Sequence, residues 1–315
     1  WWLDAPVEGF ARDGERISFR LPLELGACEA EFAGERLEGH ALLADGRRAS
    51  LSLRESPAPP VRLEDFALEV DGAHLAGTLG LPVGPGPFPV VVFVHGGGDA
   101  SRANASTRFL SEYLPRFGIA CLVCDKRGCG DSSGSWKTID FETTADDVVR
   151  QVRALREHPA IRGERIGLYA GSQGCWVAPL AAAREPAIRF LVQHSGPLVS
   201  PYEADAYAIA SSLRAKGLEE AVAPVADLWR LECQALREGV APARFQPLLT
   251  ALAGARKQPW FAAAPYEATP AGNWWLGWYG PLLDHDPLPT LRALTQPMLW
   301  LFGANDTQSD PVRNA

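Results

Sequence analysis

Apolar positions recur with different spacings in successive parts of the chain. In residues 1–58, stretches such as residues 17–21 and 49–53 alternate apolar and polar side chains, and turn dipeptides separate them. A period of two is typical of strands that bury one face. We therefore expect residues 1–58 to form a small antiparallel β unit that is incomplete at its N-terminus. The Pro-rich residues 56–60 indicate a linker after it.

From residue 62 onward, short apolar runs alternate with amphipathic segments. Buried parallel strands are nearly continuous apolar runs, and strands separated by helices are typical of a doubly wound, mostly parallel sheet. The fold class predicted for residues 62–315 is therefore α/β. The expected strands are residues 89–95, 119–124, 165–170, 189–194 and 297–302, and the expected helices are residues 104–117, 141–158 and 173–184.

Residues 200–285 interrupt this alternation. Helical patterns at residues 206–215 and 218–237 precede a Trp-rich segment that contains Trp260, Trp274, Trp275 and Trp278. An insertion at this place predicts a helical lid over the carboxyl edge of the sheet, where open α/β sheets bind ligands. The tryptophans fit a lid core and a pocket lining equally well, because buried Trp serves both purposes.

Composition and charge exclude several classes of protein. The net charge is −8, from 38 acidic and 30 basic residues without a basic run, which argues against a nucleic-acid partner. No apolar run approaches the length of a membrane span. Cys121 and Cys124 form a CxxC motif, but they lie in an apolar run without a second ligand pair, so we expect a buried strand and no metal. The compartment, cytoplasmic or secreted, stays open.

The sequence from Ala170 to Gly174 is the most specific catalytic motif in the chain. It reads Ala-Gly-Ser-Gln-Gly and lies between a predicted strand and a predicted helix. This is the nucleophile-elbow pattern with Ala in place of the first Gly. Small residues two positions before and after the serine let the strand and helix approach closely. Ser172 is therefore the candidate nucleophile.

Two further loops supply candidate partners for Ser172. His95 ends a predicted strand and is followed by three glycines. Acyl transfer needs two N–H donors for the oxyanion, and we assign these to Gly97 and Gln173. A phosphate-binding loop is disfavoured because neither of its glycine patterns is present. Asp306 follows the last predicted strand and is the candidate acid that orients a histidine, with Asp310 as the second choice.

Taken together, these stretches resemble the α/β-hydrolase superfamily. More narrowly, the chain is similar to bacterial serine esterases related to dipeptidyl-peptidases and acylaminoacyl-peptidases, which are serine aminopeptidase-like hydrolases. The resemblance extends from about residue 62 to the last residue and rests on residues 90–98, 124–136, 167–182, 194–201 and 299–308. It implies a catalytic domain at residues 62–315 and the chain order Ser, acid, His. It also implies that residues 125–128 form a structural loop without chemistry.

The general base is the missing part of this site. The family order places a histidine after Asp306, but residues 307–315 contain none. Ser is a poor nucleophile without an adjacent base. We expect the base to lie beyond residue 315, in a truncated chain that is inactive as given, and His194 and His285 are the substitutes inside the chain.

These signals predict a serine hydrolase that cleaves carboxylic esters through an acyl-enzyme intermediate. The expected partner is a small-molecule ester, and the mechanism needs no metal or cofactor. A peptidase or a thioesterase remains an alternative, because one fold supports all three chemistries. A non-catalytic binding protein is the alternative from another class. The natural substrate and the oligomeric state are not determined by the sequence.

Overall fold

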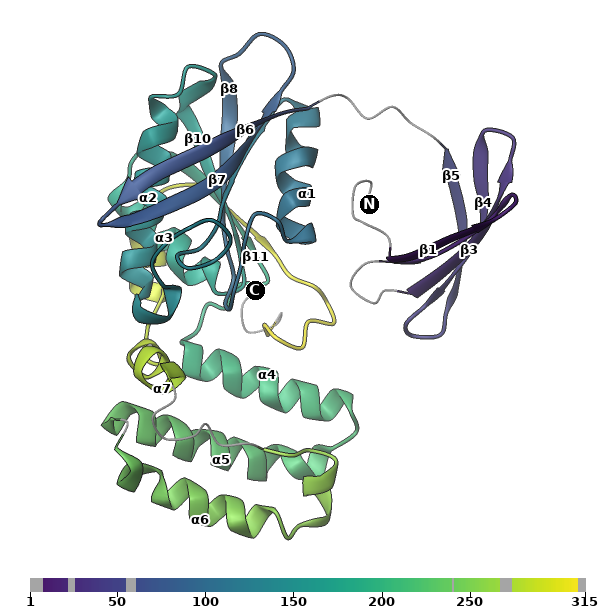
Figure 1. The fold of residues 1–315 in the computed structure, drawn as a ribbon. Helices are drawn as coiled ribbons and strands as arrows, with labels where there is room; N and C mark the ends of the chain where they lie inside the picture. Colours follow the sequence, from purple (N-terminus) through teal and green to yellow (C-terminus); the bar gives the residue numbers. More distant parts are fainter. Residues whose placement is uncertain (1–7, 22–25, 55–60, 240, 267–273, 311–315) are drawn as a thin grey trace.

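The strands of the described residues form two sheets (Figure 1). The computed structural model describes residues 8–21, 26–54, 61–239, 241–266 and 274–310. The first sheet is antiparallel, with its five strands in sequence order, and buries Ile17, Phe19, Cys28 and Ala41. It confirms the predicted N-terminal β unit. Its strands are β1 (Glu8–Asp13), β2 (Arg16–Leu21), β3 (Gly26–Ala33), β4 (Arg36–Leu43) and β5 (Arg48–Arg54).

Seven strands form the second sheet, in the order β12-β11-β10-β8-β9-β7-β6. The five strands from β12 to β9 run parallel, whereas β7 pairs antiparallel with both β6 and β9. The predicted α/β class with a mostly parallel sheet is therefore confirmed. The strand bounds are β6 (Val61–Val70), β7 (Ala73–Pro82), β8 (Phe88–Val94), β9 (Ala120–Cys124), β10 (Ile161–Gly171), β11 (Ile188–His194) and β12 (Met298–Leu301).

Helices cover both faces of this sheet (Figure 1). Helices α2 (Phe141–Arg156) and α3 (Gly174–Arg184) pack on one face, and α1 (Ala105–Tyr113) packs on the other. The helix predicted for residues 104–117 ends as a 3₁₀ turn at residues 114–117, because Pro115 lacks the N–H that an α-helix needs. Strand β8 lies between β9 and β10, so the chain reverses its winding at the β8–β10 pair. Ligands bind at the carboxyl ends of such a pair.

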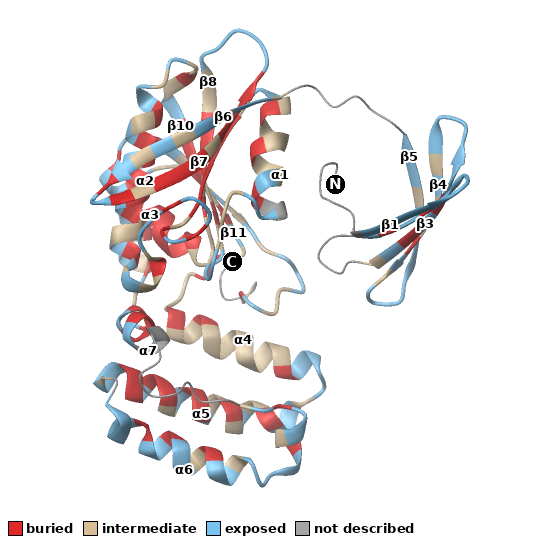
Figure 2. Cartoon of the chain, viewed as in Figure 1, coloured by how far each residue is buried: buried red, intermediate tan, exposed pale blue. Residues whose placement is uncertain are grey.

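The main core lies between the parallel strands and the helices (Figure 2). All five residues of β9 are buried, including Cys121 and Cys124, as the strand prediction requires. Burial raises the pKa of the Cys121 thiol to about 12, so it stays protonated and packs as a small apolar side chain.

Helices fill the predicted lid region. They are α4 (Pro201–Ala215), α5 (Glu219–Glu238), α6 (Gln246–Ala255) and α7 (Trp274–Tyr279), and α8 (Leu288–Ala293) leads back to β12. Trp260 is buried in a separate apolar cluster with Leu213 and Val225, so it belongs to the lid core. Trp278 lines a pocket, as described below. The side chains of Trp274 and Trp275 lie outside the described part of the structure.

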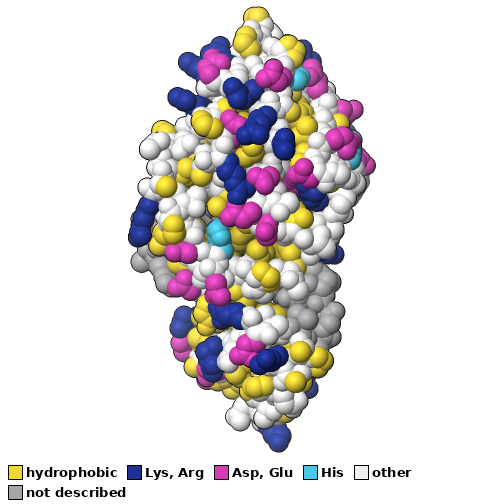
Figure 3. Space-filling model, turned by 90° about the vertical axis from the view of Figure 1, so that its left-hand side faces the viewer, with side chains coloured by type: hydrophobic (Ala, Val, Ile, Leu, Met, Phe, Trp, Pro, Cys, Tyr) yellow, Lys and Arg dark blue, Asp and Glu magenta, His cyan; other side chains and the backbone are white. Residues whose placement is uncertain are grey.

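The surface carries both signs of charge. Figure 3 shows Lys and Arg interspersed with Asp and Glu over the face that it presents, without a large patch of one sign. Among the helices that the structure describes, each is too short or too polar to cross a membrane.

Candidate active site

Ser172 occupies a strained turn between β10 and α3. Its φ is +50°, in the left-handed region that residues other than glycine rarely adopt. The Ser172 N–H donates to the carbonyl oxygen of His194 at 3.0 Å, and its carbonyl oxygen accepts from the N–H of Cys175 at 2.8 Å. The side chain is exposed. Strain of this kind is characteristic of functional sites, and here it presents a hydroxyl at the carboxyl edge of the sheet.

The neighbours of Ser172 explain why the chain can turn there. Ala170 is fully buried. A Cβ atom at Gly174 would lie 2.4 Å from the carbonyl oxygen of Val94, so only glycine fits between α3 and β8. The N-terminus of α3 directly follows the serine, where the helix dipole favours negative charge.

The loop of residues 95–98 packs against this turn. A Cβ atom at Gly96 would lie 3.4 Å from the Cβ of Ser172, and one at Gly97 would lie 3.8 Å from the side-chain carbonyl carbon of Gln173. Ser172, Gln173 and Gly97 are thus brought together. His95 has a structural contact: its Nε2 donates to the carbonyl oxygen of Cys124 at 2.5 Å. Burial lowers the pKa of His95 to about 4, so the ring is neutral at neutral pH.

Lys126 holds the same loop from the side of β9. Its Nζ donates to the carbonyl oxygens of Gly96 at 3.1 Å and Gly98 at 2.9 Å, on either side of Gly97. The ammonium group also lies 4.6 Å from the centre of the Trp136 ring. Burial lowers the pKa of Lys126 to about 8. With both flanking carbonyls bound, the peptide groups around Gly97 have a fixed orientation.

Asp306 lies in the loop after β12. Its Oδ1 accepts the N–H groups of Gln308 at 2.8 Å and Ser309 at 3.0 Å. The Ser309 hydroxyl donates to the carbonyl oxygen of Ser195, directly after β11, at 2.6 Å. Tyr207 of the lid donates to the carbonyl oxygen of Asp306 at 3.1 Å. These bonds fix the carboxylate beside the strand that neighbours β10.

The imidazole ring of neither substitute histidine is hydrogen-bonded to Ser172 within the described residues. The Nδ1 of His194 is hydrogen-bonded to the hydroxyl of Tyr169 at 2.9 Å. The ring of His285 packs edge-on against Phe141, with 5.2 Å between ring centres. Among the residues that the structure describes, no histidine is hydrogen-bonded to the side chain of Ser172 or Asp306. The structure therefore brings the nucleophile and oxyanion candidates together. Within the described residues, the rings of His194 and His285 form no hydrogen bond to them.

The sequence profile of the alpha/beta hydrolase family matches residues 91–314. This range contains the glycine loop, the turn at Ser172 and Asp306. The chain belongs to the alpha/beta hydrolase family. The family predicted from the motifs is thereby confirmed, and the order of strands along the second sheet agrees with it.

Named relatives of this chain include bacterial esterases. Esterase EstD of Thermotoga maritima is 25% identical over 303 residues, which cover 93% of this chain and 65% of that protein. Esterase FrsA of Escherichia coli K12 is 29% identical over 192 residues, which cover 60% of this chain and 45% of that protein. This chain thus spans less than two-thirds of the length of these curated relatives. The solved structure of the Pyrococcus furiosus esterase PF2001 aligns over 80% of this chain and 74% of that one, with a TM-score of 0.52 and 16% identity, and supports the fold alone.

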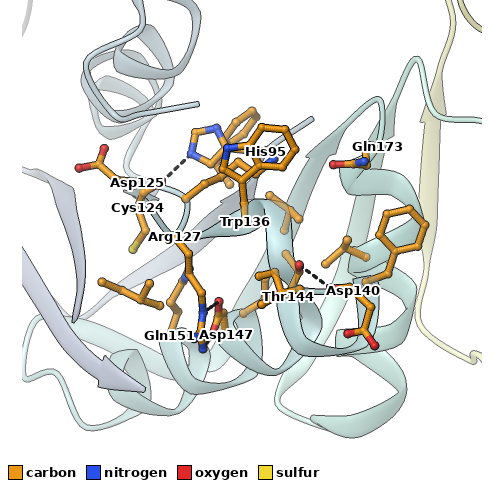
Figure 4. Close-up of a pocket in the computed structure, with 18 of the residues that line it drawn as sticks. His95, Cys124, Asp125, Arg127, Trp136, Asp140, Thr144, Asp147, Gln151 and Gln173 are labelled. Atoms are coloured by element: carbon orange, nitrogen blue, oxygen red, sulfur yellow. Dashed lines mark hydrogen bonds and ion pairs between the residues drawn. The ribbon is translucent and has the colours of Figure 1, made fainter. Parts of the chain in front are cut away.

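A pocket of this alpha/beta hydrolase opens beside Gln173 (Figure 4). Its cavity has a volume of about 50 Å³. Ring and aliphatic side chains form its walls, namely Leu75, Phe93, Val94, Trp136, Ile139, Phe141, Val148, Val177 and Trp278. Trp278 comes from the lid and donates to the carbonyl oxygen of Ile139 at 2.8 Å. Both interpretations of the tryptophans therefore hold, each for a different residue.

Two residues of this pocket are expected to have a structural role only. From the sequence, residues 125–128 are expected to form only a structural loop, yet Lys126 and Arg127 both line the pocket. A signal was present for Lys126, because lysine is rare in this chain and this one directly follows a buried strand and an Asp. Its two carbonyl partners depend on the fold of the 95–98 loop, so the sequence could not reveal them.

Proposed function

We propose that this hydrolase cleaves carboxylic esters of small molecules through an acyl-enzyme on Ser172. The observation that carries the proposal is the exposed serine at φ +50°, next to the glycine loop of residues 95–98. The names of EstD and FrsA, both esterases, support the same reaction class. The ring and aliphatic walls of the pocket favour an apolar group on the substrate.

The proposed reaction has two halves. The Ser172 oxygen attacks the acyl carbon while a histidine base accepts its proton, and Asp306 orients that histidine. The N–H groups of Gly97 and Gln173 stabilise the negative oxygen of the tetrahedral intermediate. The carbon–oxygen bond to the alcohol then breaks, and the histidine returns the proton to the leaving alcohol. Water attacks the acyl-enzyme by the same steps and releases the acid and free Ser172.

Three substrates with the same butyryl group test this proposal against its alternatives. The p-nitrophenyl ester, the thiocholine thioester and the p-nitroanilide are compared by kcat/KM, with the protein expressed from its natural gene. We expect the ester to react fastest. A faster thioester or anilide would favour a thioesterase or a peptidase. Absence of turnover on all three, with intact folding by circular dichroism, would favour a binding protein.

His194 and His285 are expected to be dispensable for the proton transfer. Each is tested by substitution with asparagine, and each variant should retain kcat/KM within about tenfold, because neither ring is bonded to Ser172. The assay is hydrolysis of p-nitrophenyl butyrate. A loss above about a thousandfold in either variant would identify that residue as the base.

Lys126 is expected to act as a positioning residue for the oxyanion loop. The Lys126→Met variant should lose about 10- to 100-fold in kcat with little change in KM, because the Gly97 N–H is no longer held at the oxyanion. Lys126→Arg should restore part of this loss. The ammonium form prevails below its pKa of about 8, so the wild-type rate should decline above that pH.

The pH profile also separates positioning from packing. In Lys126→Met, no group titrates at this place, so the decline above pH 8 should vanish. An unchanged kcat in that variant, or the same alkaline decline in it, would contradict the assignment.

A further inference from the structure

The pocket beside Gln173 ends at the buried side chain of Gln151. Gln151 is 6% exposed, lines this pocket, and its side-chain oxygen has no hydrogen-bond partner among the described residues. A buried amide oxygen without a partner costs free energy, and native proteins rarely retain one without a reason. A ligand group that reaches this amide would supply the missing bond.

The pocket extends along one face of α2 toward this amide. Thr144, Asp147 and Gln151 lie on the same face of the helix, spaced by three and four residues, and all three line the pocket. At 1.5 Å per residue, the helix rises about 16 Å from Asp140 to Gln151. Figure 4 shows Gln151 beside Asp147 and Arg127 at one end of the pocket, with Gln173 at the opposite end. A substrate held at Ser172 could therefore direct one end of its chain toward Gln151.

The charges near Gln151 are already paired. Arg127 donates from Nε to Asp147 at 2.8 Å and from a terminal nitrogen, Nη2, at 2.6 Å, a two-bond pair with both side chains buried. Such a pair is neutral overall and offers no uncompensated charge to a carboxylate or an ammonium group. The deep end of the pocket is therefore suited to a neutral group that forms hydrogen bonds.

A hydroxyl group has the required chemistry. Its O–H group can donate to the Gln151 side-chain oxygen, the atom that lacks a partner. We propose that the deep end of this pocket is a subsite for a hydroxyl group on the substrate, carried on an apolar chain or ring at the end remote from the ester. The inference deepens the proposed function, because it names a substrate class for the same site.

Binding of matched esters tests the subsite without relying on turnover. The probes are ethyl esters of ω-hydroxyalkanoic acids of increasing length, each paired with the ester in which a methyl group replaces the hydroxyl. Dissociation constants are measured by calorimetry in the Ser172→Ala protein and in the same protein with Gln151→Met. We expect the preference for the hydroxyl ester over its methyl partner to fall by about tenfold on substitution of Gln151.

Gln193→Met is the matched control. Gln193 is also a buried amide without a partner among the described residues, but it lies on β11 and does not line this pocket. Its substitution should leave the hydroxyl preference unchanged.

Two results would overturn the subsite. The first is a shift below twofold in Gln151→Met. The second is that the Ser172→Ala protein, which keeps Gln151, binds the methyl ester more tightly than the hydroxyl ester at every chain length. Either result would mean that Gln151 does not recognise a hydroxyl group on the substrate.

The two proposals fail separately. Hydroxyl-selective binding without hydrolysis in the wild-type protein would remove the esterase and keep the subsite. Ester hydrolysis without hydroxyl selectivity would keep the esterase proposal and remove the subsite.

Discussion

Replacement of Ser172 by alanine is expected to lower kcat/KM for p-nitrophenyl butyrate by about 10⁴- to 10⁶-fold. The reason is that the variant has no oxygen to attack the acyl carbon, whereas the two oxyanion donors and the pocket remain. The side chain of Ser172 is exposed, so its loss should leave the free energy of unfolding within about 0.5 kcal/mol of the wild-type value. Steady-state kinetics and urea denaturation of the same preparation measure both quantities.

Ser195 provides the control for this substitution. It follows β11, the neighbour of β10, and it also has a positive φ, of +49°. Ser195→Ala therefore removes a hydroxyl from a second strained serine at the same edge of the sheet. We expect its kcat/KM to stay within about tenfold of wild type. The nucleophile assignment would be wrong if Ser172→Ala kept more than a tenth of the wild-type kcat/KM. It would also be wrong if Ser195→Ala lost as much kcat/KM as Ser172→Ala.

The parts of the site that the sequence predicts are those that local geometry imposes. The turn at Ser172 needs small residues at fixed offsets because β10, α3 and β8 approach there, and Gly174 lies too close to the carbonyl of Val94 for any side chain. The apolar runs predict the parallel strands for a similar reason: a strand covered on both faces has few polar positions. Both patterns, the small residues around Ser172 and the apolar runs of the strands, involve residues that are close in sequence.

The parts that the sequence does not predict depend on contacts between distant elements. Gln151 occupies an amphipathic helix, where a polar residue is usually exposed, and only the packing of α2 over the sheet buries it. The partners of Lys126 come from a loop about 30 residues earlier in the chain, as the separations of 30 and 28 residues show. Trp260 and Trp278 belong to the same Trp-rich segment, yet one lies in the lid core and the other in the pocket.

A second large effect is expected on stability, from the ion pair between Arg127 and Asp147. Their side chains are 9% and 8% exposed, so both charges have lost most of their contact with water. Two hydrogen bonds compensate for this loss. Asp147→Leu leaves the Arg127 guanidinium buried without its partner and should lower the free energy of unfolding by about 3–5 kcal/mol. That is a substantial fraction of the 5–15 kcal/mol that is usual for a domain.

The neighbouring residue and the double variant show whether the loss comes from the unpaired charge. Asp146 pairs with Arg184 at 2.7 Å on the surface, with 55% of its side chain exposed, so Asp146→Leu should cost at most about 1 kcal/mol. The double variant Arg127→Met/Asp147→Leu removes both buried charges and should recover most of the stability lost in Asp147→Leu, because replacing a whole buried pair by apolar groups is often neutral. Urea denaturation followed by tryptophan fluorescence measures all three proteins. A double variant that is less stable than Asp147→Leu would mean that Arg127 stabilises the fold through its other contacts, independently of Asp147.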